Sequence, residues 1–238
     1  MALNTFDTLF TLNVPHILER IFLFLDYTSF KKCMDVCVAW NELLKSKSFK
    51  TKARSCFRKE ISGDERKLWF VSNGGSMHEV KELVSSGMLN VDCAGGNWGL
   101  TPLCAASGNG NSSVVKVLLE GGAEVDKPGL AGETPLFWAA FYGNTDVGEL
   151  LLDTGAEPNK TNKEGKTPLH VAANKGHQEM VRLLLERGAE YDRVDEEGWT
   201  PLHLATFNDH LNILQILLHR GADPNRTDVK GRKQTALH

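Results

Sequence analysis

Several features that mark enzymes, secreted proteins and membrane proteins are missing from this sequence of 238 residues. It contains no phosphate-binding loop, no nucleophile elbow and no paired Cys/His set with zinc-ligand spacing. Its 5 cysteines are odd in number and scattered, so we expect reduced thiols and no disulfide framework. The most apolar stretch, residues 10–25, contains Glu19 and Arg20, which argues against both a bilayer-spanning helix and a signal peptide.

A strong charge of either sign is also missing. The formal net charge is -3 and the isoelectric point lies close to 6.2, which gives no general attraction to nucleic acid or membrane surfaces. A basic run between residues 45 and 59 is interpreted as a solvated helical face and linker, with nuclear import as the alternative. We therefore expect a cytoplasmic protein, or one that is also nuclear, that binds neither nucleic acid nor membrane and needs no metal or cofactor.

A repeat of 33 residues is the dominant feature that the sequence does contain. Glycine recurs at this spacing, and the first four copies each stand two positions before Thr-Pro-Leu. The five glycines are Gly99, Gly132, Gly165, Gly198 and Gly231. Self-similarity at such a period is typical of stacked-repeat solenoids rather than of compact enzymes. The units closely resemble ankyrin repeats, over roughly residues 64–238, and this resemblance implies an α-solenoid with β-hairpin-like loops.

Each unit is predicted to form two helices. The threonine of the motif is expected to cap the first helix, because its oxygen accepts from a first-turn amide, and proline follows at the first helical position. These threonines are Thr101, Thr134, Thr167 and Thr200. The second helix carries larger apolar residues at helical intervals and ends before a glycine, namely Gly122, Gly155, Gly188 or Gly221. We interpret His170 and His203, in the same motif, as structural groups that hold the turn by hydrogen bonds.

The two ends of the array depart from this pattern. Residues 68–92 align as a degenerate first repeat, in which Leu68 takes the leucine position and Arg66-Lys67 replaces Thr-Pro. The sequence stops where the first helix of a further repeat would begin, so we expect a truncated chain or a short isoform. The expected repeats are residues 64–97, 98–130, 131–163, 164–196 and 197–229, with the start of another at 230–238.

Residues 8–55 have a different apolar pattern, without the repeat period. A proline is followed by an Ile-Leu pair, an Ile-Phe pair and a Leu-Asp turn, and a Val-Cys pair then precedes a tryptophan. This order resembles the F-box, a small three-helix module, with a basic linker after it at residues 56–63. The resemblance implies docking to a Skp-type adaptor and, through it, to a cullin. The residues carried over for that contact are Val14, Pro15, Ile17, Leu18, Ile21, Phe22, Leu25, Val36, Cys37 and Trp40.

The physical pattern of this segment leaves one alternative open. Its first predicted helix is apolar around most of its circumference, and such a helix is either buried or waits for a partner. In the alternative interpretation it caps the amino end of the repeat stack and contacts no adaptor.

A binding surface is predicted from positions that the repeat scaffold does not explain. In this repeat class the hairpin tips and the first helices line a concave face. Aromatic residues stand there, two of them at the positions just before the inter-helix glycine, with a basic section between them. Aromatic side chains are favoured anchors at protein interfaces. The predicted substrate-binding residues are Trp98, Leu100, Trp138, Phe141, Tyr142, Lys166, Lys175, Trp199 and Phe207, and Leu130 and Lys163 stand beside them. The alternative is that some of them, above all Trp138 and Phe207, pack between repeats.

Together the two resemblances imply a non-catalytic adaptor. The F-box would dock on a cullin-RING ubiquitin ligase, and the repeats would recruit a protein substrate, so that proximity promotes the transfer. The rival interpretations are a ubiquitin-independent ankyrin scaffold, a pathogen effector that mimics a host receptor and, least favoured, a self-contained enzyme. An enzyme would need titratable groups gathered in a pocket, and the scaffold already explains those of the repeats.

Overall fold

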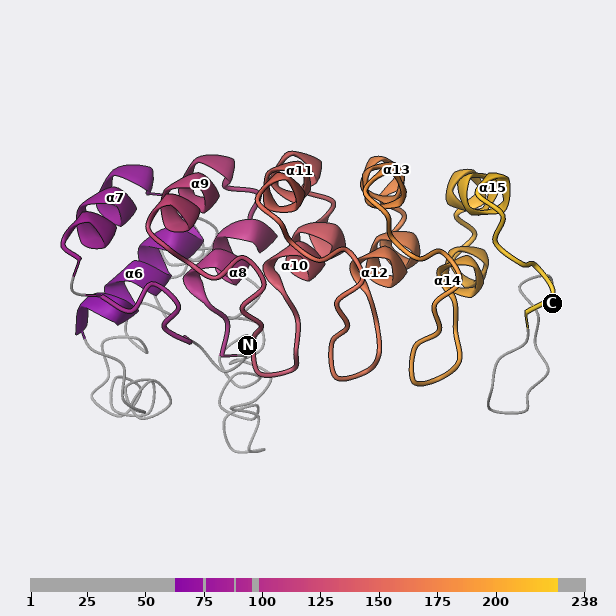
Figure 1. Ribbon diagram of the computed structural model, residues 1–238, viewed down its shortest axis with the longest axis horizontal. Coiled ribbons are helices and arrows are strands. Elements are labelled where there is room, and N and C mark those ends of the chain that lie inside the picture. Colours follow the sequence, from indigo (N-terminus) through magenta and orange to yellow (C-terminus); the bar gives the residue numbers. More distant parts are fainter. Residues whose placement is uncertain (1–62, 75, 88, 96–98, 227–238) are drawn as a thin grey trace, which may run out of the picture. The chain divides into compact units, whose positions relative to one another are not determined.

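The computed structural model describes residues 63–74, 76–87, 89–95 and 99–226 (Figure 1). The predicted F-box, all ten of its predicted adaptor-binding residues and Trp98 lie outside these ranges, as do residues 230–238. The described residues form ten helices in five consecutive pairs. The pairs are α6 (Gly63–Gly74) with α7 (Met77–Ser85), α8 (Pro102–Gly108) with α9 (Ser112–Glu120), α10 (Pro135–Tyr142) with α11 (Thr145–Asp153), α12 (Pro168–Lys175) with α13 (Gln178–Glu186), and α14 (Pro201–Phe207) with α15 (Leu211–His219).

The helix pairs stack side by side in two rows, and extended loops project from the row of first helices (Figure 1). One row holds α6, α8, α10, α12 and α14, the other holds α7, α9, α11, α13 and α15, and each helix contacts its neighbours in the same row. Within the described ranges no strand is present, and only an isolated antiparallel bridge joins Gly95 to Leu100. This helical architecture is consistent with the predicted solenoid. No helix in the same ranges has the length and apolar character needed to cross a bilayer.

The predicted caps begin the helices of the first row. In α8, α10, α12 and α14 the threonine Oγ1 accepts a hydrogen bond from the backbone N–H three residues later, and proline follows the threonine. The Thr101 cap receives the N–H of Cys104 at 3.1 Å, and the Thr200 cap receives that of His203 at 3.3 Å. These bonds satisfy amides that the helix itself leaves unpaired. The capping prediction is therefore confirmed.

The two histidines of the motif complete these caps. His170 Nδ1 accepts from the Thr167 N–H at 3.2 Å, while its Nε2–H donates to the Trp199 carbonyl oxygen at 3.1 Å in the next repeat. His203 Nδ1 makes the equivalent bond to the Thr200 N–H, also at 3.2 Å. His170 thus joins its own cap to the following loop, which confirms the structural role predicted for this residue.

One continuous apolar core runs through the stack. The leucine of each Thr-Pro-Leu motif and the alanine three residues later are buried in the first row, and valine or isoleucine with leucine is buried in the second. The buried second-row residues include Val114, Leu118, Val147, Leu151, Val181, Leu184, Ile213 and Leu217. Gly122, Gly155, Gly188 and Gly221, predicted to end the second helices, all have a left-handed φ of +87° to +96°. Each helix pair buries much of its apolar surface against the neighbouring pairs. The stability of a repeat therefore depends on contacts with the repeats beside it.

Polar contacts tie consecutive repeats together at the ends of the first helices. Asn144 Nδ2–H donates to the Ser107 and Gly108 carbonyls at 2.8 Å. In the following repeats this role passes to histidine, since His177 Nε2 bonds to the Phe141 carbonyl at 3.0 Å and His210 Nε2 to the Asn174 carbonyl at 3.2 Å. The Gly108, Phe141 and Asn174 carbonyls lie in the last turn of their helices and receive these bonds from the next repeat, whereas the Ser107 carbonyl also accepts the Gly110 N–H at 3.3 Å.

A strained residue stands in the turn after α14. Asp209 has φ +57°, and it is the one residue other than glycine with a left-handed φ in the described ranges. The same turn in earlier repeats holds glycine, for example Gly176 at φ +82°. A side chain in this conformation costs about 1 kcal/mol, and aspartate tolerates it better than alanine.

Replacing Asp209 by glycine is therefore expected to raise the free energy of unfolding by about 0.5 kcal/mol, because relief of the strain exceeds the extra entropy of the unfolded glycine. Asp209→Ala provides the control and is expected to lower the same free energy by about 1 kcal/mol. Urea titrations of the three proteins measure this order. Equal stability of the glycine and alanine variants would contradict strain at this turn.

Candidate functional site

An aromatic cluster lies at the end of α10. Trp138, Phe141 and Tyr142 stand at helical intervals of three and four, which places them on one side of the helix. The Trp138 and Tyr142 rings stack with centroids 6.2 Å apart, and the Phe141 and Tyr142 rings meet edge to face at 5.0 Å. Trp138 and Phe141 are partly buried, whereas Tyr142 is 45% exposed. Trp138 and Phe141 therefore form the partly buried side of the cluster, and Tyr142 forms its exposed edge.

Two polar groups belong to this cluster, and only the Tyr142 hydroxyl lies on an exposed residue. Partial burial raises the pKa of the Tyr142 hydroxyl above its ordinary value, so the group stays protonated and can donate a hydrogen bond at neutral pH. The indole Nε1 of Trp138 is buried without a hydrogen-bond partner in the described part of the chain. Tyrosine and tryptophan with an apolar body and a polar end are typical of contact surfaces.

The next repeat extends this surface with a positive charge. Lys175, the last residue of α12, is exposed and holds its Nζ 4.5 Å from the centroid of the Phe141 ring. This distance is within the range of a cation–π contact, which fixes the ammonium group beside the aromatic rim. The sequence predicted both residues as binding groups, and the structure brings them together.

A second aromatic pair stands on the last described repeat. The rings of Trp199 and Phe207 meet edge to face at 5.4 Å, and Phe207 is 73% exposed. Phe207 is thus largely uncovered by the repeat of α12, which is the first-row neighbour of α14 among the described residues. Asn208 Nδ2–H donates to Asn174 Oδ1 at 2.9 Å and joins α14 to the end of α12. Because α10, α12 and α14 are consecutive neighbours, we call Trp138, Phe141, Tyr142, Lys175, Trp199 and Phe207 the aromatic strip.

The remaining predicted binding residues lie on or near the loops. Leu130 is 64% exposed, whereas Leu100 is partly buried and pairs with Gly95 in the isolated bridge. Lys166 forms an ion pair with Glu164, with Nζ 2.8 Å from the carboxylate, so its charge is largely balanced. Lys163 is exposed. The predicted basic section is therefore weaker in the structure than in the sequence.

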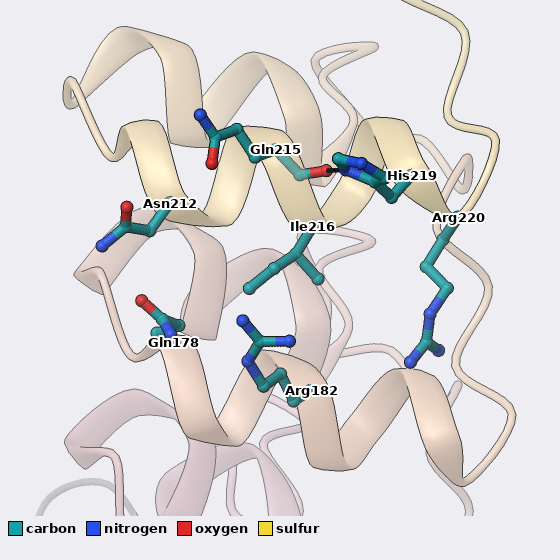
Figure 2. Close-up of a pocket in the computed structure, with 7 residues that line it drawn as sticks. All are labelled: Gln178, Arg182, Asn212, Gln215, Ile216, His219 and Arg220. Carbon is teal, nitrogen blue, oxygen red and sulfur yellow. Dashed lines mark hydrogen bonds between the residues drawn. The ribbon is translucent and has the colours of Figure 1, made fainter.

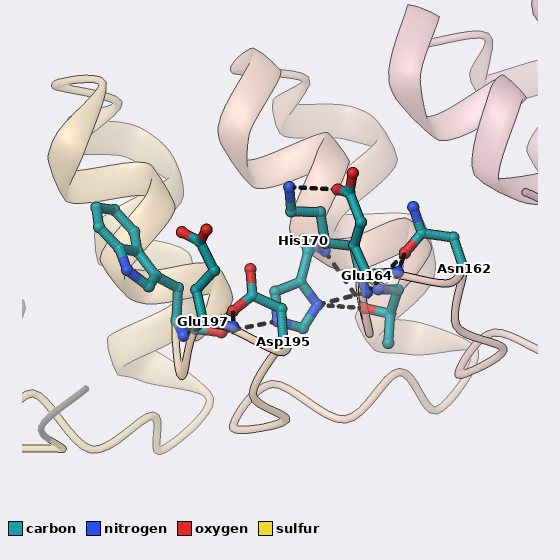
Figure 3. A network of polar contacts seen from close by, with 8 residues as sticks. Asn162, Glu164, His170, Asp195 and Glu197 are labelled. Atoms are coloured by element: carbon teal, nitrogen blue, oxygen red, sulfur yellow. Dashed lines mark hydrogen bonds and ion pairs between the residues drawn. The ribbon is translucent and has the colours of Figure 1, made fainter. Parts of the chain in front are cut away.

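Consecutive loops are hydrogen-bonded to each other. Figure 3 shows the side-chain bonds within two loop tips, around Asn162 and Asp195. Asn162 Oδ1 accepts the N–H groups of Glu164 and Lys166, and Asp195 Oδ1 accepts those of Glu197 and Trp199, which closes each loop tip. Two backbone bonds link the loops, from the Lys163 N–H to the Ala131 carbonyl at 2.9 Å and from the Glu196 N–H to the Glu164 carbonyl at 3.0 Å. The loops thus form a connected row.

Acidic groups at the loop tips were not singled out from the sequence. Glu164, Glu196 and Glu197 are exposed on consecutive tips, next to Lys163. The alignment of the repeats gives their positions, but their side-by-side placement follows from the backbone bonds between loops. The tip row therefore carries mixed charge, in contrast to the apolar strip on the first helices.

The described residues offer little covalent chemistry. No group of three or more potential metal ligands is present among them. Burial raises the pKa of the Cys93 and Cys104 thiols to about 12, so both remain protonated and weakly nucleophilic at neutral pH. What this surface can do is bind through apolar, aromatic and hydrogen-bonding contacts.

Comparison with known proteins gives one clear relation. A search of curated proteins found no match. The family model of ankyrin repeats in three copies matches residues 68–162 and 149–228, which together cover more than half of the chain. The matched segments begin after the predicted F-box, and no F-box domain was detected. The repeats, the caps and the family match agree, and the chain belongs to the ankyrin-repeat family, whose repeats form a protein-interaction module.

Proposed function

We propose that this protein is a substrate-recognition adaptor, in which the aromatic strip binds a protein substrate and residues 8–55 dock on a ubiquitin-ligase core. The observation that carries the substrate-binding half is the exposure of Phe207 and Tyr142 beside partly buried aromatic neighbours. Clustered exposed aromatic groups on a soluble scaffold mark interaction surfaces. The strip crosses three repeats, so an extended segment or a helix of a partner would contact all of them.

The chemistry of the strip favours a partner segment of mixed character. Phe207 and Tyr142 would bury against apolar side chains, because removing their rings from water drives the association. Lys175, held over the Phe141 ring, would meet a carboxylate or carbonyl oxygen of the partner. The Tyr142 hydroxyl would supply a directional hydrogen bond.

The ligase half of the proposal rests on the sequence order of residues 8–55. Their resemblance to an F-box supports a contact to a Skp-type adaptor and, through it, to a cullin. The chain itself would perform no catalysis, because its contribution is to hold the substrate at high effective concentration near the associated enzymes. Such a role places the protein in the cytoplasm, or also in the nucleus. The absence of an F-box match favours the second candidate, a ubiquitin-independent ankyrin scaffold.

Affinity capture with the full chain tests the ligase contact and the substrate contact independently. Ile21→Ala with Trp40→Ala is expected to abolish recovery of the Skp-type adaptor and cullin while the substrate is retained. Tyr142→Ala with Phe207→Ala is expected to have the opposite effect. Each anchor truncation should cost about 2 kcal/mol, or roughly 30-fold in affinity. Quantitative mass spectrometry of the captured proteins measures both ratios.

The control is Met77→Ala, which removes an exposed apolar side chain from α7, outside the strip. It should leave both classes of captured protein unchanged, and circular dichroism should show that every variant is folded. If the wild-type chain captures neither adaptor nor cullin, the ligase contact is wrong and the ubiquitin-independent ankyrin scaffold is the function that remains. Retention of every specific partner by the Tyr142/Phe207 variant would overturn the role of the strip.

A further inference from the structure

A groove separates the second-row helices α13 and α15 (Figure 2). The aromatic strip belongs to the other row, which holds α10, α12 and α14 (Figure 1). It has a volume of about 430 Å³, within the range of ligand-binding sites. Its lining residues are Gln178, Arg182, Asn212, Gln215, Ile216, His219 and Arg220. None of them is acidic. The sequence analysis did not identify this groove, because neither helix alone shows it.

Arg182 is the central polar group of the groove. Its guanidinium group points toward Ile216 across the space between the helices (Figure 2). Within the described ranges Arg187, Arg193 and Arg220 each lie within ion-pair distance of a carboxylate, whereas Arg182 forms no ion pair. An arginine without a carboxylate partner keeps its full set of donors for an anion, which it binds in a two-pronged geometry.

The surroundings of Arg182 strengthen the positive character of the groove. Arg220 lies at its other side, and its only recorded carboxylate contact, to Glu186, is long at 3.9 Å and solvent-exposed. Exposed ion pairs of this kind contribute little, so an incoming anion can compete for Arg220. The carboxylate of Glu179, next to Gln178 in α13, accepts from the Gln178 amide at 3.4 Å.

The other groups of the groove favour a peptide over an isolated anion. Gln178, Asn212 and Gln215 carry amides that both donate and accept, as a peptide backbone requires. Ile216 is 8% exposed and contributes a small apolar surface to the groove, facing Arg182 (Figure 2). His219 is turned onto its own helix, since its Nδ1–H donates to the Gln215 carbonyl at 2.7 Å. Positive charge beside an apolar patch is complementary to acidic residues that flank a leucine or a similar side chain.

We propose that the groove between α13 and α15 is a second docking site, which binds an acidic segment of a protein partner through Arg182 and Arg220. The site does not depend on the aromatic strip, because the two surfaces lie on different rows of helices. Both can therefore be occupied at once, and a partner that reaches both would gain affinity from the linkage.

Fluorescence anisotropy with the full chain and a labelled peptide of sequence GEELEEG tests the proposal. The neutral peptide GQQLQQG serves as the reference ligand. Arg182→Gln with Arg220→Gln is expected to weaken binding of the acidic peptide about tenfold or more, since charge-assisted hydrogen bonds are lost. Added salt should weaken binding by the wild-type chain. Hydrogen exchange should show protection by the peptide in Gln178–Glu186 and Leu211–His219.

The matched control is Lys116→Gln with Arg193→Gln, which removes two exposed positive charges that do not line the groove. This variant should bind the acidic peptide within about twofold of the wild type. Equal weakening by both double variants would overturn the site, and so would equal binding of the neutral peptide. Absence of peptide binding at about millimolar concentration would also overturn it, because specific binding below that range is expected of such a site. Binding to phosphatidylserine vesicles alone, lost on Arg182→Gln, would replace the protein partner by a membrane.

Discussion

Leu169→Ala is expected to lower the free energy of unfolding by about 3 kcal/mol. Leu169 belongs to the Thr-Pro-Leu motif of α12, is 0% exposed and sits in the middle of the first row, where α12 contacts both α10 and α14. Removing its side chain leaves a cavity at the coupling between repeats. Because stability in a solenoid depends on contacts between neighbours, unfolding should also become less cooperative. Urea unfolding followed by circular dichroism measures the midpoint and the slope.

Leu211→Ala is the matched control for this experiment. Leu211 opens α15 and is 68% exposed, so the same chemical change there is expected to cost less than about 0.5 kcal/mol. A loss of similar size in both variants would contradict the interpretation that the repeated leucines carry the stack. An unchanged slope in Leu169→Ala would show that the repeats unfold as one unit despite the cavity.

His170 is expected to give the stability a marked dependence on pH. Burial lowers the pKa of this histidine from 6.5 to about 4, although the Trp199 carbonyl and the buried Asp195 carboxylate oppose the shift and Lys166 supports it. Between pH 6.5 and about 4 the unfolded chain binds a proton at this residue that the folded chain does not bind. Stability contributed by neutral His170 is therefore present in full above pH 6.5 and falls as the pH decreases toward 4.

The size of this effect follows from about 1.4 kcal/mol for each pKa unit, which gives about 3 kcal/mol by pH 4. The measurement is the free energy of unfolding of the wild type minus that of His170→Gln, at pH 7 and at pH 4. Taking the difference cancels carboxylates that titrate in both proteins. This difference should be about 3 kcal/mol smaller at pH 4 than at pH 7, because the wild type loses the stability that neutral His170 contributes. A difference that does not change with pH would show that His170 is protonated as easily in the fold as in the unfolded chain.

Much of the candidate binding site follows from the alignment of the repeats. The position of Phe207 or Tyr142 relative to its cap and inter-helix turn is the same in every unit, so the sequence places both on the first helices. Whether such a side chain is exposed depends on what the neighbouring repeat places beside it. Phe207 proves open, whereas Trp138 is partly buried. The same prediction was made for both residues, because the sequence of one repeat does not show which side chains of the next repeat will cover them.

Charge on the surface was harder to predict than aromatic character. Lys166 counted as a free basic group, but Glu164 neutralises it across the loop tip. Arg182 was not predicted as a binding residue, although no carboxylate lies within ion-pair distance of it in the described part of the chain. Ion pairing depends on side-chain directions over a few ångströms, and the position along the chain does not fix those directions.

The sequence by itself determined the repeat period, the caps at Thr101, Thr134, Thr167 and Thr200, and the apolar faces that form the core. These features depend on contacts between residues a few positions apart, and each is copied in every repeat, so the pattern is visible without coordinates. Only the tertiary structure decided that Lys175 lies over the Phe141 ring and that α13 and α15 enclose a groove. Those features join residues about one repeat apart, and they exist only once stacking brings neighbouring repeats into contact.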